Sequence, residues 1–369
     1  MSPHGRKEQF ARLCWGAAAA LCLLVAGAAR TAETDEPSAE RDLPPAVRRA
    51  IDLGVNYLVE NQREDGSWGN KGRVGTYPGA MTALAGLALV AGGSLPESGP
   101  HAANVRRAVE YLLNHADAET GLIGGEESGR PLFGHGFAML FLAQVYGSEG
   151  DLQLRQRIGR VLAKAVEFTR NAQSADGGWY YEPDKSQDEG AVTVTQMQGL
   201  RACADAGIAV PADVVKRGTD YIIRSANADG GIAYRASEPK TEDGVPDYVR
   251  PSRPPITCAA VVTLYSAGMY DSELAKKAFD YASRSVSPRG ASVVGAGHYF
   301  YAHLYLSQAM YFRGGDDWRA YFPQVRDWLL SVQRPDGSWE GDFFGTTYGT
   351  AVALLILQLP DGALPSVQR

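Results

Sequence analysis

The chain has 369 residues, of which 45% are hydrophobic and 21% are charged, and its formal net charge is −6. These values are typical of a globular protein and fit one large domain or two medium ones. Phosphate binding needs clustered Lys and Arg, and the sequence has no long basic run, so a nucleic-acid partner is excluded.

The first residues have the pattern of a secretory signal peptide. Three basic residues, Arg6, Lys7 and Arg12, precede an uncharged apolar run that ends in small residues, which is the order of a signal peptide. The run is short for a membrane span, which needs about 20 apolar residues. We expect a signal peptide over 1–32, a linker over 33–44, a periplasmic or secreted location and no membrane span after cleavage. A retained N-terminal anchor is the minor alternative.

Only two cysteines, Cys203 and Cys258, follow the leader. Two cysteines cannot build a disulfide framework, and no CxxC pair indicates structural zinc. We therefore expect the fold to depend on its apolar core, which a chain of this length can bury.

A repeated segment organises the rest of the chain. Residues 62–68, 173–179 and 333–339 share the pattern QxxDGxW, and each follows a stretch with apolar residues every three to four positions. That spacing predicts amphipathic helices. Weaker copies of the helix and turn begin near Val105, Val214 and Ser272, so six amphipathic helices are predicted.

Each turn is followed by a second stretch that is poor in charge and rich in Ala and Leu. Aligning the six stretches places a leucine at one position in all of them, about every 54 residues: Leu87, Leu142, Leu200, Leu264, Leu306 and Leu357. Amphipathic outer helices and apolar inner helices predict an all-α fold, an α/α toroid of six hairpins (an α6/α6 barrel) over 45–360, with a tail over 361–369. A linear solenoid is the alternative, but it needs polar capping repeats at both ends, and the last apolar stretch is not one.

The three QxxDGxW segments, with their alternating polar and apolar helices, resemble the QW repeats of the squalene cyclase and prenyltransferase superfamily. The resemblance covers about residues 45–360 and is closest to exported bacterial proteins of this repeat family. It implies the toroid fold, a central cavity of the kind that holds isoprenoids, and a structural role for the Gln, Asp-Gly and Trp of the motif.

The catalytic motifs that the resemblance implies are absent from the sequence. Triterpene cyclases use an Asp of a DxDD motif, and the nearest acidic pair here is Asp188 and Glu189 before the third apolar stretch. Asp188 is a candidate acid, with a helix N-cap as the alternative. Prenyltransferases bind zinc through Asp-x-Cys and a later His. Cys258 and His298 occur in that order, but Ile256 replaces the Asp, so we expect no metal and no cofactor.

A ring of residues near the start of the inner helices is the candidate site. Seven positions before the aligned leucines stand Ala80, His135, Thr193, Thr257, Tyr299 and Thr350. We predict ligand binding by His135, Thr193, Thr257, Cys258, His298, Tyr299 and Tyr301, because convergent polar groups above an apolar cavity are the usual form of a small-molecule site. The alternative is that these residues cap helices and fill the core. His298 and His303 lie about 140° apart on a helix and cannot share a metal ion.

Two functions remain open at this point. The first is an exported protein that binds an apolar, isoprenoid-like ligand or a partner protein in its cavity without turnover. The alternative is an enzyme of the terpenoid cyclase or carbohydrate lyase or hydrolase type, with His135, His298 and Tyr299 as acid and base candidates. An interaction surface alone is a third possibility. Residues 235–255 are rich in Pro, Gly and charge and are expected to cover the cavity mouth.

Overall fold

The computed structural model describes residues 43–70, 72, 75–124, 130–148, 150–236, 251–289 and 298–361. The signal peptide expected over 1–32 lies outside these residues, as do the linker up to residue 42, the end of the tail and residues 237–250 of the loop expected at the cavity mouth. Within the described part the secondary structure is helical, with isolated bridges instead of strands. None of the described helices is both long and apolar enough to cross a membrane.

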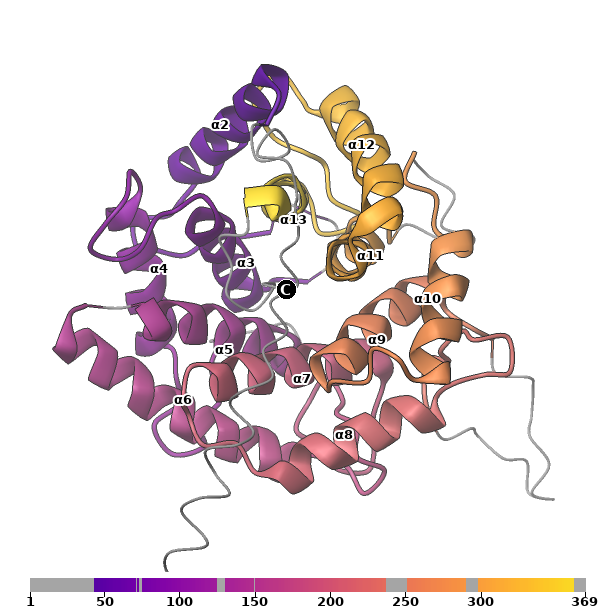
Figure 1. Cartoon of the computed structure of the whole chain (residues 1–369). Coiled ribbons are helices and arrows are strands. Elements are labelled where there is room, and N and C mark those ends of the chain that lie inside the picture. The colour runs from indigo at the N-terminus through magenta and orange to yellow at the C-terminus, as the bar shows by residue number, and fades with distance from the viewer. Residues whose placement is uncertain are drawn as a thin grey trace, which may run out of the picture. The chain divides into compact units, whose positions relative to one another are not determined.

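The helices form six hairpins, each with an outer and an inner member (Figure 1). The outer helices are α2 (Pro45–Glu60), α4 (Ala102–Asn114), α6 (Leu152–Ala172), α8 (Ala212–Arg224), α10 (Glu273–Ser285) and α12 (Gly315–Val332). The inner helices are α3 (Pro78–Ala91), α5 (Pro131–Ser148), α7 (Gly190–Asp205), α9 (Pro254–Ser266), α11 (Tyr299–Arg313) and α13 (Thr346–Leu357). A short 3-10 helix, η2 (Leu359–Asp361), follows. The predicted all-α toroid of six hairpins is confirmed.

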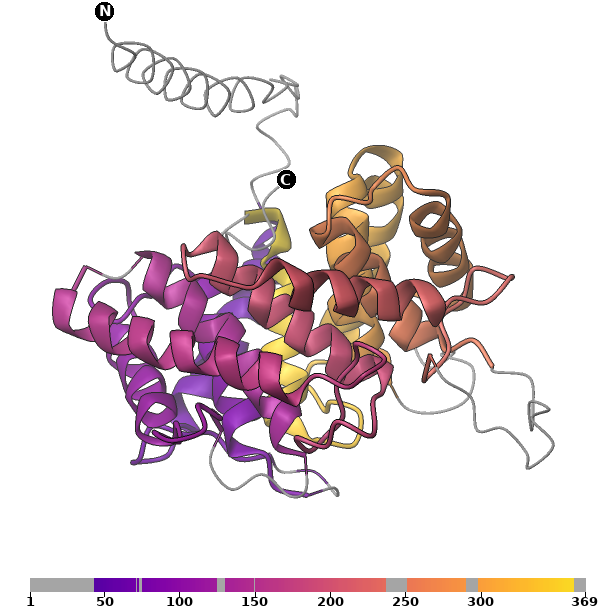
Figure 2. The ribbon, with the colours of Figure 1, turned by 90° about the horizontal axis from the view of Figure 1, so that it is seen from below.

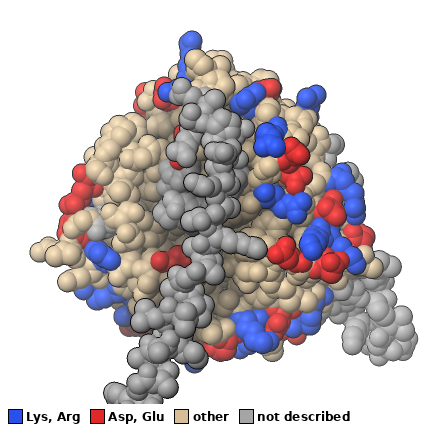
Figure 3. Space-filling view, in the orientation of Figure 1, with Lys and Arg blue, Asp and Glu red and all other residues tan. Residues whose placement is uncertain are grey.

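The polarity of each helix decides its ring. Every residue of α3 is buried, because a helix that is apolar all round must be covered on all sides. Helix α8 buries only Val214, Gly218, Tyr221 and Ile222, which share one face. In the space-filling view the charged side chains gather mainly along the outline of the molecule (Figure 3). The outer helices thus separate the apolar inner ring from water.

The ring is closed by contacts between the first and last hairpins. Each inner helix packs against the next, and α13 packs against both α3 and α2. The Tyr57 hydroxyl of α2 lies 2.6 Å from the Thr346 hydroxyl of α13. Seen from the side, the helices of both rings lie beside one another (Figure 2). An open solenoid would leave its end helices without such partners.

The three QxxDGxW turns each join their own hairpin to the next one. The side-chain amide of Gln173 donates to the carbonyl oxygen of Gly177 in its own turn, at 2.8 Å, and to that of Val214 in α8, at 3.0 Å. Gln62 and Gln333 make the same pair of bonds to their own turns and to the next outer helices, which for Gln333 is α2. The motif therefore has a structural role.

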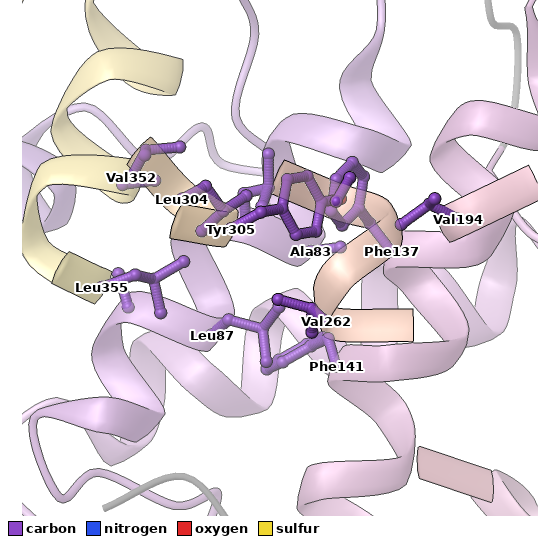
Figure 4. Packing of buried hydrophobic residues seen from close by; sticks show 14 of the residues in the cluster. Ala83, Leu87, Phe137, Phe141, Val194, Val262, Leu304, Tyr305, Val352 and Leu355 are labelled. Carbon is purple, nitrogen blue, oxygen red and sulfur yellow. The ribbon is translucent and has the colours of Figure 1, made fainter. Parts of the chain in front are cut away.

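The axis of the toroid is filled by apolar side chains from the inner helices. Ten of them point toward one another in Figure 4: Ala83, Leu87, Phe137, Phe141, Val194, Val262, Leu304, Tyr305, Val352 and Leu355. All ten belong to one buried hydrophobic cluster. This apolar layer fills the middle of the barrel, so a cavity can form only at one end or the other.

Candidate ligand cavity

A cavity of about 490 Å³ lies at the end of the barrel where the inner helices begin. Its lining comes from the first two turns of the six inner helices and from the segments before them: Tyr77, Ala80, Met81, Leu84, Arg130, Phe133, Phe137, Tyr181, Ala191, Tyr234, Ser252, Arg253, Pro254, Pro255, Ile256, His298, Tyr301, Phe344 and Tyr348. Leu84 and Phe137 also line a cavity of only about 50 Å³ toward the other helix ends. The larger volume is within the range of small-molecule sites.

Most of the cavity wall is aromatic or aliphatic. Phe133 and Phe137 of α5 meet edge to face with ring centroids 5.6 Å apart, and Tyr77 and Phe344 do so at 5.8 Å. Such pairs hold the rings in fixed orientations and present their faces and edges to the space between them. The wall therefore offers mainly apolar contact area, and its polar groups are the hydroxyls of five tyrosines and the side chains of Arg130, Arg253, His298 and Ser252.

Two tyrosines on this wall share a hydrogen bond. The hydroxyls of Tyr181 and Tyr234 lie 2.5 Å apart and join the third hairpin to the fourth. Burial raises the pKa of both phenols, and the nearby charge of Glu189 raises them further. Both hydroxyls therefore stay protonated at neutral pH and can donate a hydrogen bond.

Glu189 lies behind this tyrosine pair. It caps α7, where its carboxylate accepts hydrogen bonds from the backbone N–H groups of Ala191 and Val192, and its side chain is fully buried. Burial raises the pKa of Glu189 to about 7, although these N–H groups and the Tyr234 hydroxyl oppose the rise. A carboxyl group that holds a proton near neutral pH thus contacts a phenol of the cavity wall.

Asp342 is a second buried carboxyl group at this end of the barrel. It accepts from the backbone N–H groups of Phe300 and Tyr301, at 3.2 Å each, and so caps α11 from the last hairpin. Among the described residues it is the only non-glycine with a positive φ, at 46°. Burial raises the pKa of Asp342 to about 7. Its bonds give it a role in joining hairpins, and it does not line the cavity.

The threonines of the predicted ring face the turns instead of the cavity. The hydroxyl of Thr193 accepts from the backbone N–H of Trp179, at 3.0 Å, and donates to the carbonyl oxygen of Glu189. Thr257 does the same with Ile232 and Arg253. Equivalent bonds come from Thr82 and Thr350, which accept from Trp68 and Trp339. In the first hairpin the position is thus filled by Thr82 instead of Ala80.

His135 occupies the same position in the second hairpin. Its Nδ1 accepts from the backbone N–H of Ile123, at 3.0 Å, so its proton is on Nε2, which lies 3.0 Å from the Thr169 hydroxyl. The ring is fully buried, and burial lowers the pKa of His135 to about 4. His135 is therefore neutral, has both nitrogens engaged and does not line the cavity.

Three other candidates also lie outside the cavity lining. The Tyr299 hydroxyl donates to the carbonyl oxygen of Pro288, and its ring stacks at a tilt on Trp328 with centroids 3.8 Å apart. Cys258 is fully buried, and burial raises the pKa of its thiol, which keeps it inert. Asp188 is buried and accepts from the Ser174 hydroxyl at 3.1 Å. Tyr299 and Asp188 thus bond to the connections between the outer and inner helices of their own hairpins.

His298 and Tyr301 are the predicted residues that line the cavity. His298 precedes α11 and meets Phe343 edge to face with centroids 5.9 Å apart. Burial lowers the pKa of His298, which favours its neutral form. The Tyr301 hydroxyl is buried and has no hydrogen-bond partner among the described residues. In the same part of the chain no three His, Cys, Asp or Glu side chains gather closely enough to hold a metal ion.

Four residues of the cavity wall could not be singled out from the sequence. Tyr181, Tyr234, Arg130 and Arg253 lie in the connections before inner helices, where no periodic pattern identifies a facing side. One signal was available, because Tyr181 and Tyr234 are 53 residues apart, which is close to one repeat. Glu189 was recognised only as the neighbour of Asp188.

No family model matches this chain, and no curated protein does either. Solved structures do match. The apo type II terpene cyclase MstE from Scytonema is 17% identical with a TM-score of 0.56, covering 86% of this chain and 98% of its own. A protein from Actinoplanes is 19% identical with a TM-score of 0.53, covering 86% and 99%.

A carbohydrate enzyme shares the architecture as well. An inactive variant of an α-1,6-mannanase from Salegentibacter sp., solved with α-1,6-mannotriose, is 9% identical with a TM-score of 0.61, covering 86% of this chain and 99% of its own. Identities this low establish the fold alone. The chain therefore has the α/α toroid that terpene cyclases and this mannanase also have, and its function must be argued from its own cavity.

Proposed function

We propose that this chain binds an apolar, isoprenoid-like small molecule in the cavity at the start of its inner helices. The observation that carries the proposal is a volume of about 490 Å³ enclosed by aromatic and aliphatic side chains from all six hairpins. Burying apolar ligand surface against such a wall is favourable by roughly 25 cal/mol for each Å² removed from water. A sugar would need a wall with many more hydrogen-bonding groups.

The similar structures offer a precedent for each kind of ligand. MstE has been solved in complex with its substrate geranylgeranyl dihydroxybenzoate, at 18% identity to this chain and a TM-score of 0.55. The mannanase has been solved with mannotriose on the same architecture. The aromatic lining of the present cavity supports the first of these two precedents. If the leader is a signal peptide as proposed from the sequence, the ligand is met in the periplasm or outside the cell.

Filling the cavity is expected to weaken ligand binding. Ala191 lines the cavity near the start of α7, and Ala191→Phe would place a ring in the ligand space while leaving the backbone bond to Glu189 intact. Ala204→Phe is the matched control, because Ala204 is exposed near the end of the same helix. We expect Ala191→Phe to weaken binding of a C20 isoprenoid alcohol at least about tenfold, which corresponds to ~1.4 kcal/mol, and Ala204→Phe to leave it unchanged.

The binding measurement is a titration monitored by intrinsic fluorescence. It is combined with mass spectrometry of molecules extracted from the purified chain. Absence of any co-purified apolar molecule, together with equal affinities of the two variants, would contradict the proposal.

A second candidate function is proton-transfer catalysis on the bound molecule. It is favoured by the sequence of contacts from Glu189 to Tyr234 and from Tyr234 to Tyr181 at the cavity wall. A protonated Glu189 can pass a proton through the Tyr234 and Tyr181 hydroxyls to an oxygen atom of the bound molecule, and as a carboxylate it can take a proton back by the same route. General acid catalysis of this kind contributes about 10²–10⁴-fold to a rate.

Glu189→Gln is expected to remove turnover and to change how stability depends on pH. In the folded protein the pKa of Glu189 is about 7 against an ordinary value of 4.5, so folding favours the protonated group. Its contribution to stability is therefore full below about pH 4.5 and is lost as the pH rises through 7. The difference in free energy of unfolding between wild type and Glu189→Gln should follow that course between pH 4.5 and 8, whereas the exposed Glu182→Gln control should show no such course.

Turnover of a C20 isoprenoid would be measured on the same variants by product analysis. A catalytic role requires that Glu189→Gln lower the rate at least about 100-fold with ligand affinity retained. Unchanged turnover in Glu189→Gln would leave this carboxyl group with the role of a helix cap alone.

A further inference from the structure

Two arginines at the cavity have no carboxylate partner among the residues that the structure describes. Arg130 directly precedes α5 and Arg253 directly precedes α9, both line the cavity, and both are exposed. Neither forms an ion pair with another described residue. The Arg130 guanidinium lies 4.6 Å from the centroid of the Tyr181 ring, so a cation–π contact holds it against the wall. The apolar cavity thus carries positive charge at its edge.

The backbone adds to this positive potential. The lining comes from the N-terminal ends of the inner helices, and the partial positive charge of a helix is at that end. The two acidic residues nearby oppose it weakly, because burial raises the pKa of Glu189 and of Asp342 to about 7. Both carboxyl groups also point to backbone N–H groups instead of to the arginines.

An unsatisfied buried hydroxyl points to a ligand independently of these charges. Tyr301 lines the cavity and is only 9% exposed, yet its hydroxyl has no hydrogen-bond partner among the described residues. A buried polar atom without a partner is costly, and a polar ligand atom in the cavity would remove that cost. The ring of Tyr305 packs on it edge to face, at 5.0 Å. The wall is therefore prepared for a molecule with oxygen atoms as well as apolar surface.

From the placement of Arg130, Arg253 and the Tyr301 hydroxyl around one apolar cavity, we propose that the ligand is an acidic amphiphile. Its single anionic head, a carboxylate or a phosphate, pairs with the two arginines, and its apolar body fills the aromatic space below. Arginine suits this role because its planar guanidinium binds either oxyanion through two parallel hydrogen bonds. This assignment rests on the proposed binding function and specifies the chemistry of its ligand.

The test compares three probes that share one C20 isoprenoid chain: the carboxylic acid, the alcohol and the alcohol's monophosphate. Dissociation constants are measured by calorimetry at pH 6, where both acidic probes carry negative charge and Glu189 and Asp342, each with a pKa of about 7, are mostly protonated. We expect at least one acidic probe to bind about 10- to 100-fold more tightly than the alcohol, the usual gain from hydrogen bonds to a charged group. The tighter of the two acidic probes identifies the head group.

The double variant Arg130→Ala, Arg253→Ala should abolish this preference and leave the affinity for the alcohol unchanged. Arg155→Ala is the matched control, because Arg155 makes a similar contact with the Tyr146 ring, at 5.0 Å, outside the cavity lining. Equal affinities of all three probes in wild type would overturn the acidic head and leave the binding function standing. Failure of every probe to bind, in wild type and variants alike, would overturn both.

Discussion

Replacing Trp339 with alanine is expected to lower the free energy of unfolding by about 3–5 kcal/mol, the usual cost of removing a buried tryptophan. The Trp339 side chain is fully buried, and its indole N–H donates to the carbonyl oxygen of Leu329 at 2.8 Å. Its ring also lies against Gly54 of α2, where an added Cβ would come within 2.7 Å of it. Its loss therefore opens a cavity where the last hairpin meets the first.

Trp339→Phe and urea unfolding make this prediction specific. Phenylalanine keeps most of the buried volume but cannot donate to Leu329. We therefore expect the free energy of unfolding of Trp339→Phe to lie between those of wild type and Trp339→Ala. An alanine variant that loses less than about 1 kcal/mol, a typical value for point substitutions in general, would show that the closure does not depend on this ring.

Gly177→Ala is the second substitution with a large expected effect. Gly177 has a φ of 90°, and a Cβ there would lie 2.4 Å from the carbonyl oxygen of Arg217 in the next outer helix. Gly207 has a similar φ of 85°, but nothing lies within 4 Å of its Cβ position. The left-handed conformation costs alanine about 1–2 kcal/mol, and overpacking adds about 1–3 kcal/mol. We expect Gly177→Ala to lower the free energy of unfolding by about 2–5 kcal/mol. Gly207→Ala should lower it only by the cost of the left-handed conformation, about 1–2 kcal/mol.

Comparing the two variants isolates the contact between hairpins from the cost of the backbone conformation. Both are measured by thermal and urea unfolding against wild type. Equal losses at the two sites would mean that the turn can move away from α8 without cost.

The fold was accessible from the sequence because it repeats. The polarity difference between the outer and inner helices recurs in each hairpin, and the Gln and Trp of the turn recur in three of the six. The apolar character of α13 indicated closure, since a terminal helix of a solenoid would need a polar face. The structure adds the partners of that apolar surface in the first hairpin, which are α2 and α3.

The residues that line the cavity were harder to predict from the sequence, for a reason of helical geometry. The alignment of the inner helices found an equivalent position in each hairpin, but the side chains there, such as His135 and Thr193, bond to the preceding turn. Positions two residues away on a helix point about 200° away. Phe133 and Phe137 flank His135 by two residues and line the cavity. The repeat shows which residues are equivalent in the six hairpins. Whether their side chains point to the cavity depends on which face of each inner helix is turned inward.

Residues outside the repeat pattern were the hardest to foresee. Glu189 and Asp188 are neighbours of similar charge, yet one contacts a phenol of the cavity wall and the other the Ser174 hydroxyl. Their directions follow from the backbone at the start of α7 and from the connection that carries Tyr234. No spacing rule in a single sequence contains that information.

Closure of the ring between α2 and α13 also sets an order of events in time. Helix α2 is among the first parts of the domain to be synthesised, and the helix that covers it ends at Leu357. No shorter N-terminal piece can complete the ring. The apolar face of α2 therefore stays uncovered until nearly the whole chain has been synthesised. Contacts of such long sequence separation slow folding and keep apolar surface exposed meanwhile. The ring can therefore close only after synthesis of the whole domain, and its folding cannot be completed during synthesis.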